Sequence, residues 1–217
     1  MGLFITFEGT DGSGKTTQIQ QLTAHLETEG RIVCTTREPG GTKIGNQIRH
    51  VLHDVNNIEM TAEAEILLYS ASRAQLVREL VLPRLAQGEV VLCDRYVEST
   101  YAYQGYGREL NFDMLRRLGE FATQGVRPDL IIYLDLDIQA GLARKATLAA
   151  TGQEVLNRMD KLEQDFYQRV RDGYHELARQ DSEPTRWLIL DASAPIETIS
   201  QQVWARVSAL LESVIST

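Results

Sequence analysis

A single lysine lies among glycines near the start of the chain, in GTDGSGKT at residues 9–16. This stretch matches the pattern G-x-x-x-x-G-K-[ST], whose backbone N–H groups surround an anion where a helix begins. In such a loop Lys15 reaches the β- and γ-phosphates of a nucleotide, and the Thr16 hydroxyl is a ligand of Mg²⁺. A glycine turn that binds nothing is the alternative, but a strand-like run at residues 3–7 and a helical pattern after the loop supply the context that the motif requires. The loop predicts a nucleotide-phosphate site without saying which reaction takes place there.

Charged residues follow two other strand-like runs. Asp94 and Arg95 come directly after VVLC, and Arg37 comes shortly after the run that ends at Thr35. In an open α/β sheet, ligands bind at the carboxyl ends of the strands. We therefore expect both arginines near the glycine-rich loop, with Arg95 beside a second phosphate. The alternative for Asp94 and Arg95 is an ion pair that caps the sheet.

An aromatic residue and an arginine lie one helical turn apart in LLYSASR, where Tyr69 and Arg73 occupy positions i and i+4 of a long helical pattern. Residues at this spacing share one face of a helix. The ring can stack on a nucleobase while the guanidinium group donates to a carbonyl at the edge of that base. Taken alone, the pair also fits an ordinary amphipathic helix. Together with the loop and the charged strand ends, it favours a second nucleotide site.

Short β-rich runs recur along the chain, each apolar at consecutive positions. They lie at residues 3–7, 31–35, 90–93, 130–134 and 187–190. Strands of this kind are buried on both faces, as in a parallel sheet. Helical patterns lie between and after them, at residues 16–29, 44–52, 62–86, 114–123, 138–149, 162–180 and 196–215. The alternation predicts an α/β fold with a five-stranded parallel sheet and helices on both of its faces.

Length and composition limit the class of protein. The chain has 217 residues, of which 43% are hydrophobic, and we expect one domain over residues 1–217. A formal net charge of -8 argues against a nucleic-acid groove, which needs an excess of Lys and Arg. No run approaches the roughly 18 apolar residues of a membrane span. Cys34 and Cys93 lie in strand-like runs, where buried apolar roles are expected, and this suits a cytoplasmic protein.

Four blocks of the sequence resemble bacterial thymidylate kinases and occur in that family's order: FEGTDGSGKTTQ, TREPGGT, LLYSASRAQLV and DRYVESTYAYQGYGR. The resemblance extends from Phe4 to about Asp191. It implies a P-loop NTPase fold with a mobile lid segment at about residues 141–158. It also implies transfer of the ATP γ-phosphoryl group to dTMP, with Mg²⁺ bridging phosphates, and a homodimer formed through packed helices. The helices expected at residues 62–86 and 114–123 are candidates for the dimer face.

The same resemblance implies an ATP site made of the loop and one lid residue, which packs on adenine. Its residues are Gly9, Thr10, Asp11, Gly12, Ser13, Gly14, Lys15, Thr16, Thr17 and Arg144. The metal is expected at Thr16 and Asp94. Catalytic roles are implied for Lys15, Arg95 and Asp11, with Asp11 facing the sugar 3′-hydroxyl and the metal region.

The implied dTMP site combines the strand ends with the Tyr69 helix. Its residues are Asp11, Arg37, Glu38, Tyr69, Arg73, Arg95, Thr100, Tyr103 and Gln104. Arg95 and Arg37 are expected to hold the phosphate, Tyr69 to stack on thymine, and Arg73 to donate to thymine O4. Thr100 and Gln104 are expected at the base edge and Tyr103 at the sugar. The family more often has Phe at the position of Tyr69, so the added hydroxyl has no assigned partner.

A cation must also reach the transferring phosphoryl group. One branch of the family carries an arginine in the loop directly after the Asp, but here that position is Gly12. The cation is therefore expected from the lid, although residues 147–157 contain no arginine, unlike the usual pattern. We take Arg158 as the catalytic candidate and Lys145 as the next one.

Two other functions remain open at the level of the sequence. Another nucleoside monophosphate kinase or a deoxynucleoside kinase shares the loop and the sheet. A nucleotide-dependent switch or motor domain is less well supported, because the chain has no N-K-x-D-type block for base recognition. Phosphorylation rates across dTMP, dUMP, dCMP, AMP and thymidine separate these alternatives.

Overall fold

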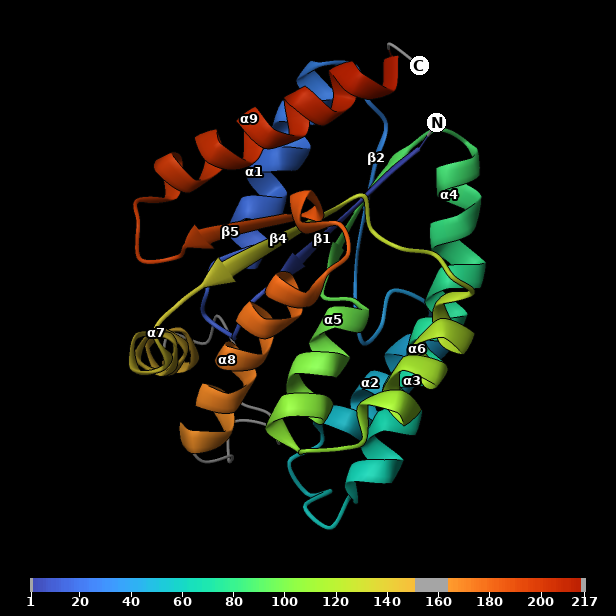
Figure 1. Ribbon diagram of the computed structural model, residues 1–217, viewed down its shortest axis with the longest axis vertical. Coiled ribbons are helices and arrows are strands. Elements are labelled where there is room, and N and C mark those ends of the chain that lie inside the picture. Colours follow the sequence, from blue (N-terminus) through green and yellow to red (C-terminus); the bar gives the residue numbers. More distant parts are fainter. Residues whose placement is uncertain (1, 151–163, 216–217) are drawn as a thin grey trace.

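The computed structural model describes residues 2–150 and 164–215 and contains one five-stranded parallel sheet, which confirms the predicted α/β fold (Figure 1). The spatial order is β2-β3-β1-β4-β5. The strands are β1 (Leu3–Glu8), β2 (Val33–Arg37), β3 (Val90–Asp94), β4 (Leu130–Asp135) and β5 (Trp187–Asp191). Each extends one or two residues beyond the predicted carboxyl end. That extension matters because it brings charged residues into the last rung of the sheet.

Parallel pairing aligns those charged ends along one edge of the sheet. Arg37 of β2 is opposite Asp94 of β3, and Asp94 is also level with Phe7 of β1. On the other side of β1, Asp135 of β4 is opposite Asp191 of β5. The carboxyl edge is therefore polar although the strands themselves are apolar, and this is where ligands of open α/β sheets bind.

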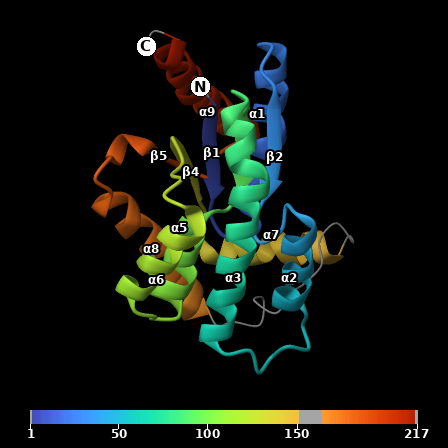
Figure 2. The same cartoon turned by 90° about the vertical axis from the view of Figure 1, so that its right-hand side faces the viewer.

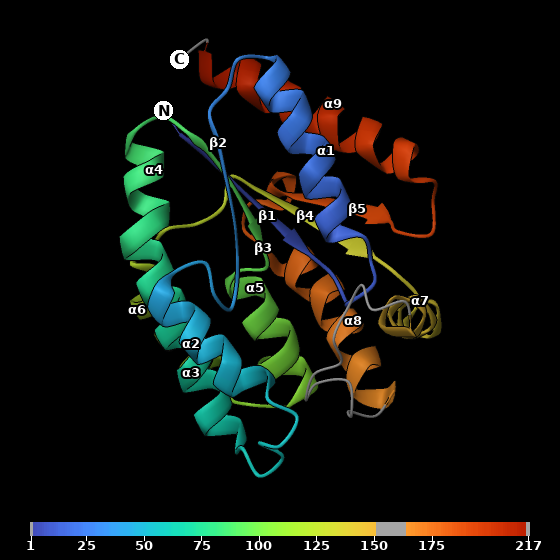
Figure 3. The ribbon, with the colours of Figure 1, turned by 180° about the vertical axis from the view of Figure 1, so that it is seen from behind.

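Two helices cover one face of the sheet (Figure 3). They are α1 (Lys15–Thr28) and α9 (Ile196–Ile215). Alternate residues of β1 face them, because successive side chains of a strand point to opposite faces, and Ile5 and Phe7 are fully buried there with Leu22 of α1 and Val203 of α9. This layer fixes the start of α1, and with it the loop that precedes the helix.

The other face is covered by helices from the middle and the later part of the chain (Figure 1). Phe4 of β1 packs there against Tyr96 and Leu76, while Tyr133 of β4 packs on Tyr174. The helices on this side are α3 (Ala62–Leu76), its continuation η1 (Val77–Val81) and α4 (Leu82–Ala86), then α5 (Val97–Thr100), η2 (Tyr101–Gly107) and α8 (Gln164–Gln180). Figure 2 shows α3 along this side, flanked by α2 (Lys43–His53) and α6 (Phe112–Thr123). The described part of the chain also contains α7 (Ile138–Ala150) and the short η4 (Pro184–Arg186).

Burial on both faces, expected of all five strands, is wrong for β2 and β5. Thr35 and Arg37 of β2 are exposed, Cys34 is only partly buried, and Ile189 of β5 is 43% exposed. These two strands are the edges of the sheet, so each has a neighbour on one side only. Their apolar runs look like those of the central strands, and the sequence pattern alone does not reveal the position in the sheet.

Two helical details also differ from the predicted elements. The helix expected over residues 62–86 contains a π-helical turn, η1, between α3 and α4. After β3 the chain forms α5 and the π-helix η2, where no helix was predicted. The segment VESTYAYQGYG has few aliphatic residues, so no helical pattern stands out in it, and Ser99, Thr100, Tyr103 and Gln104 of this segment line the cavity. No helix within the described residues is both long enough and apolar enough to cross a membrane.

Candidate active site

A cavity of about 1220 Å³ lies at the carboxyl edge of the sheet. Its size exceeds the usual range for one small ligand, roughly 300–1,000 Å³. It brings together most of the predicted site residues: Asp11, Gly12, Ser13, Gly14, Lys15, Thr16, Thr17, Arg37, Glu38, Tyr69, Arg73, Asp94, Arg95, Thr100, Tyr103, Gln104 and Arg144. Gly9 and Thr10, the first two residues of the loop, do not line the cavity, and Arg158 is outside the described residues.

The glycine-rich loop joins β1 to α1 through conformations that need glycine. Gly9 has φ +136°, and a Cβ there would lie 2.6 Å from the Leu134 carbonyl oxygen. Gly14, the N-cap of α1, has φ +93° in the left-handed region. Because neither position tolerates a side chain at low cost, the backbone is exposed to a ligand where the first N–H groups of α1 have no helical partner.

Lys15, near the end of this loop, is buried, with 7% of its surface exposed. Its Nζ donates to the carbonyl oxygens of Gly9 at 3.1 Å and Thr10 at 3.0 Å. Burial, and then the nearby Arg95 guanidinium, lower the pKa of Lys15, while Asp94 and Asp11 act to raise it. The ammonium group is therefore held at the loop by weak acceptors that an anionic ligand can replace.

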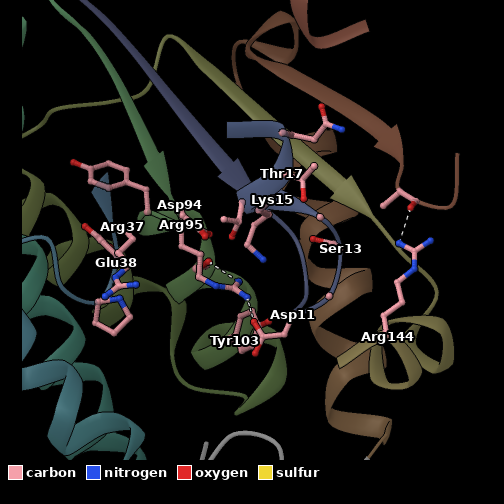
Figure 4. A pocket seen from close by; sticks show the side chains of 18 of the residues that line it. Asp11, Ser13, Lys15, Thr17, Arg37, Glu38, Asp94, Arg95, Tyr103 and Arg144 are labelled. Carbon is pink, nitrogen blue, oxygen red and sulfur yellow. Dashed lines mark hydrogen bonds and ion pairs between the residues drawn. The ribbon is translucent and has the colours of Figure 1, made fainter. Parts of the chain in front are cut away.

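Arg95 lies in the middle of the cavity, paired with Asp11 of the loop (Figure 4). Its Nη2 is 2.6 Å from Asp11 Oδ1, and its guanidinium carbon lies 5.2 Å from the centre of the Tyr103 ring. The residue adopts φ +70°, an uncommon conformation for a non-glycine residue. Burial alone would lower the pKa of Arg95, but Tyr103, Asp11 and the neighbouring groups raise it well above the usual range.

A buried carboxylate, Glu8, is linked to Arg95 through the hydroxyl of Ser99. Glu8, the last residue of β1, accepts hydrogen bonds from the backbone N–H of Tyr96, the Ser99 hydroxyl and the Tyr174 hydroxyl. Ser99 in turn accepts from Arg95 Nη1 at 3.4 Å. Burial raises the pKa of Glu8, although the Ser99 hydrogen bond and the Arg95 charge oppose this shift. The network joins β1, α5 and α8 around the arginine.

Arg73 and Glu38 form a second buried pair at the other end of the cavity. Arg73 Nε donates to Glu38 Oε2 at 2.7 Å, and its Nη2 donates to the Tyr96 carbonyl and to Thr100 Oγ1. Burial acts to lower the pKa of Arg73, but Glu38 outweighs it and the pKa rises. Two atoms of the pair, Arg73 Nη1 and Glu38 Oε1, are buried without a hydrogen-bond partner among the described residues. Such atoms are costly unless a ligand or water satisfies them.

Figure 4 separates the two ends of the cavity: Arg37 and Glu38 lie on one side of the loop and Arg144 on the other. Arg144 of α7 donates from Nη1 to the Ala192 carbonyl at 3.0 Å. Ala192, Ala194 and Ile196 line the cavity beside it. A guanidinium plane next to apolar side chains is suited to a flat aromatic ligand.

Asp94 at the end of β3 and Thr16 at the start of α1 fit a Mg²⁺ ion. Asp94 Oδ1 is buried and has no hydrogen-bond partner within the described chain, and Thr16 lines the cavity at the start of α1. Among the described residues no group of three or more His, Cys, Asp or Glu gathers to form a closed metal site. Mg²⁺ commonly uses one or two protein ligands together with phosphates and water, so the pair is adequate.

Sequence reasoning missed several residues of the site, among them Glu8, Arg49 and Tyr167. Glu8 could have been found from its position, at the end of a strand and directly before the first loop glycine. Arg49 of α2 lines the cavity and donates to the Pro39 carbonyl at 3.0 Å, and burial together with Arg37 lowers its pKa. Tyr167 of α8 also lines the cavity. Nothing in the local sequence distinguishes Arg49 or Tyr167 from surface residues.

Comparison with known proteins gives one consistent result. The family model for thymidylate kinase matches residues 7–203. The chain is 47% identical to a thymidylate kinase of Roseiflexus sp. over 221 aligned residues, which cover 99% of this chain and 97% of the relative. It is 47% identical to a thymidylate kinase of Deinococcus radiodurans, covering 95% of this chain and 97% of the relative. The crystal structure of thymidylate kinase from Ehrlichia chaffeensis superposes with a TM-score of 0.76 at 29% identity, over 95% of this chain and 98% of that one.

Proposed function

Because the chain belongs to the thymidylate kinase family and phosphorylates dTMP to dTDP, we propose that ATP and dTMP lie end to end in the cavity, with Arg95 where they meet. The observation that carries this arrangement is the Arg95–Asp11 pair, which links the phosphate loop to the strand end that faces the second subsite. The volume of about 1220 Å³ suits two nucleotides better than one.

At the donor end, the loop and Lys15 hold the phosphates of ATP, and Arg144 packs on adenine. Thr16 and Asp94 hold Mg²⁺, which neutralises charge on the phosphates when it is bound. A phosphate oxygen of dTMP forms the new bond to the γ-phosphorus, and the bond to the β-phosphate oxygen breaks to release ADP. The protein contributes position and positive charge rather than a covalent intermediate.

At the acceptor end, Arg37 and Arg95 hold the dTMP phosphate, and Arg49 adds a third cation beside them. Tyr69 stacks on thymine, and the unsatisfied Arg73 Nη1 donates to thymine O4. The unsatisfied Glu38 Oε1 lines the same end and accepts from a hydroxyl of the nucleotide or from water. Tyr103 packs at the sugar, Asp11 faces its 3′-hydroxyl, and Thr100 supports Arg73.

A coupled assay of ADP release tests the substrate assignment. The wild-type protein should use dTMP fastest, dUMP next, and dCMP, AMP and thymidine poorly. Thymidine lacks the phosphate that Arg37 and Arg95 bind, and cytosine places an amino group opposite the Arg73 donor. Faster turnover of dCMP or thymidine than of dTMP would overturn the assignment.

The pH dependence of dTMP use is expected to depend on Glu38. Burial raises the pKa of this carboxyl to about 7, although the charge of Arg73 acts against the shift. As the pH drops below this value, the carboxyl becomes protonated and orients Arg73 less firmly, so kcat/KM for dTMP should fall. The second pKa of the dTMP phosphate, at about 6, contributes a separate acid limb.

Glu38→Gln separates the two effects, because it removes the carboxyl and keeps its shape. The variant should lose the limb near neutrality and keep the one near pH 6, at a lower overall kcat/KM. A pH profile measured across both limbs checks this. An unchanged profile in Glu38→Gln would contradict the role of Glu38.

The lid cation remains a proposal because Arg158 lies outside the described residues. Arg158→Ala is expected to lower kcat about 10²-fold, on the scale of a lost arginine finger, with little change in the KM for dTMP. Arg127→Ala is the matched control, since Arg127 is exposed and does not line the cavity. If Arg158→Ala keeps full kcat, the assignment moves to Lys145.

We also propose one functional domain over residues 1–217, a cytoplasmic location and a homodimer.

Two candidate helices for the dimer face pack together, and each presents a large apolar side chain to solvent: Leu67 of α3 is 57% exposed and Phe121 of α6 is 80% exposed. A dimer through these helices would bury both. Sedimentation equilibrium decides the oligomeric state.

A further inference from the structure

Three polar side chains form a row that ends at the cavity. Arg108, directly after η2, contacts Glu65 of α3 through two nitrogens, with Nη2 at 3.0 Å from Oε2 and Nε at 3.4 Å from Oε1. Glu65 Oε1 accepts a hydrogen bond from Gln104 Nε2 at 2.9 Å. Glu65 is fully buried, whereas the Arg108 side chain is 24% exposed and Gln104 lines the cavity.

The row determines which way the Gln104 amide points. A carboxylate only accepts hydrogen bonds, so the amide nitrogen of Gln104, not its oxygen, must face Glu65. The amide oxygen is then the atom directed away from Glu65, and no described residue donates a hydrogen bond to it. Arg108 neutralises the charge of Glu65 and donates no hydrogen bond to Gln104, so Glu65 remains an acceptor for the Gln104 amide.

Packing alone gives no reason for a carboxylate at this position. Moving a charged pair out of water costs free energy, and apolar residues of similar size often stabilise a fold as well or better. Glu65 is one of the few fully buried charged residues of the described chain. Its charge has a use if the orientation of the neighbouring amide matters for the ligand.

We propose that Glu65, held by Arg108, is a positioning residue for base selection, because it fixes Gln104 with its amide oxygen toward the ring N3–H of the acceptor base. This proposal rests on the dTMP kinase function above. Thymine and uracil carry a proton at N3, whereas cytosine presents a lone pair there. The fixed oxygen accepts from the first two and repels the third, and this contact at N3 is separate from the Arg73 contact at the adjacent C4 carbonyl.

The test is Glu65→Gln, assayed with dTMP, dUMP and dCMP. The new amide can donate to Gln104 as readily as accept from it, so Gln104 occupies both orientations. We expect the ratio of kcat/KM for dTMP over dCMP to fall about tenfold, mainly through the KM values. The ratio of dTMP to dUMP should stay unchanged, because both bases carry the N3 proton. A role in folding alone would not alter one ratio and spare the other.

A double-mutant cycle identifies the route of the effect. If Glu65 acts through Gln104, Glu65→Gln should change the dTMP-to-dCMP ratio in the wild-type background and leave it unchanged in Gln104→Ala. The same change in both backgrounds, or none in either, overturns the proposal. If Glu65→Gln does not fold, Arg108→Met replaces it: without its cation the buried Glu65 carboxyl takes up a proton and can then donate to Gln104, so the ratio should again fall, and Arg108→Lys should restore it in part. A wild-type protein that fails to phosphorylate dTMP overturns the function itself, whereas one that phosphorylates it with a ratio insensitive to Glu65→Gln overturns only this inference.

Discussion

Replacement of Arg95 by methionine is expected to lower kcat/KM for dTMP about 10³-fold, the scale of losing a guanidinium group at a reacting phosphate. The side chain is the central cation of the cavity, and its pKa is raised well above the usual range, so it stays charged at any working pH. The change also leaves Asp11 without its 2.6 Å contact to Arg95, at the point where the two nucleotides are proposed to meet. Both effects act on the transferring group rather than on the fold.

Backbone strain does not explain the expected loss. Arg95 has φ +70°, and methionine bears the same conformational cost as arginine in that conformation. Arg95→Lys keeps the charge but not the planar fork, so it should recover only part of the activity. Initial-rate kinetics of the three proteins, with melting temperatures as the control for folding, check this. A kcat/KM for Arg95→Met within tenfold of the wild type would contradict a phosphate-binding role.

Replacement of Lys15 by methionine should reduce kcat by about 10³-fold, near the upper end of losses for a single charge-stabilising donor. Among the described residues, its Nζ donates only to the Gly9 and Thr10 carbonyls, which are neutral acceptors. Moving from these carbonyls to a phosphate increases the electrostatic attraction as negative charge develops on the β–γ bridge. Methionine fills the same space without the charge.

Lys43→Met is the matched control, because Lys43 is an exposed lysine that does not line the cavity. It should keep wild-type rates, while Lys15→Met binds dTMP normally but turns over slowly. Binding of dTMP measured by calorimetry, together with single-turnover rates, distinguishes the two variants. Normal single-turnover rates in Lys15→Met would remove Lys15 from the chemical step.

Much of the fold could be predicted from local sequence. The apolar runs located all five strands, and the glycine-rich loop located the start of α1 within a residue. The pattern could not show that β2 and β5 are edges, because strand order depends on helix crossovers far apart in the chain. It also missed η2, which has few aliphatic residues to mark a helical period and in which Tyr103 and Gln104 line the cavity.

The candidate site likewise contains some residues that the local sequence predicts and others that it does not. Lys15, Arg95 and Arg73 follow from motifs or from strand ends, and the cavity brings these predicted residues together. Glu65 lies 39 residues from Gln104 along the chain, so no spacing rule connects them. The place of Arg49 likewise depends on how α2 packs against α3. Residues that orient other residues are the hardest to predict, because they act through contacts that only the folded chain creates.

The separation of the cavity into two ends also matters for engineering. The residues that we propose to meet the acceptor base come mainly from α3 and η2, whereas those proposed to meet the ATP phosphates come from the loop between β1 and α1. Substitutions far apart combine almost additively. A designer could therefore retune the enzyme for an unnatural pyrimidine, such as a prodrug monophosphate, by redesigning α3 and η2 while leaving the phosphoryl-transfer apparatus as it is.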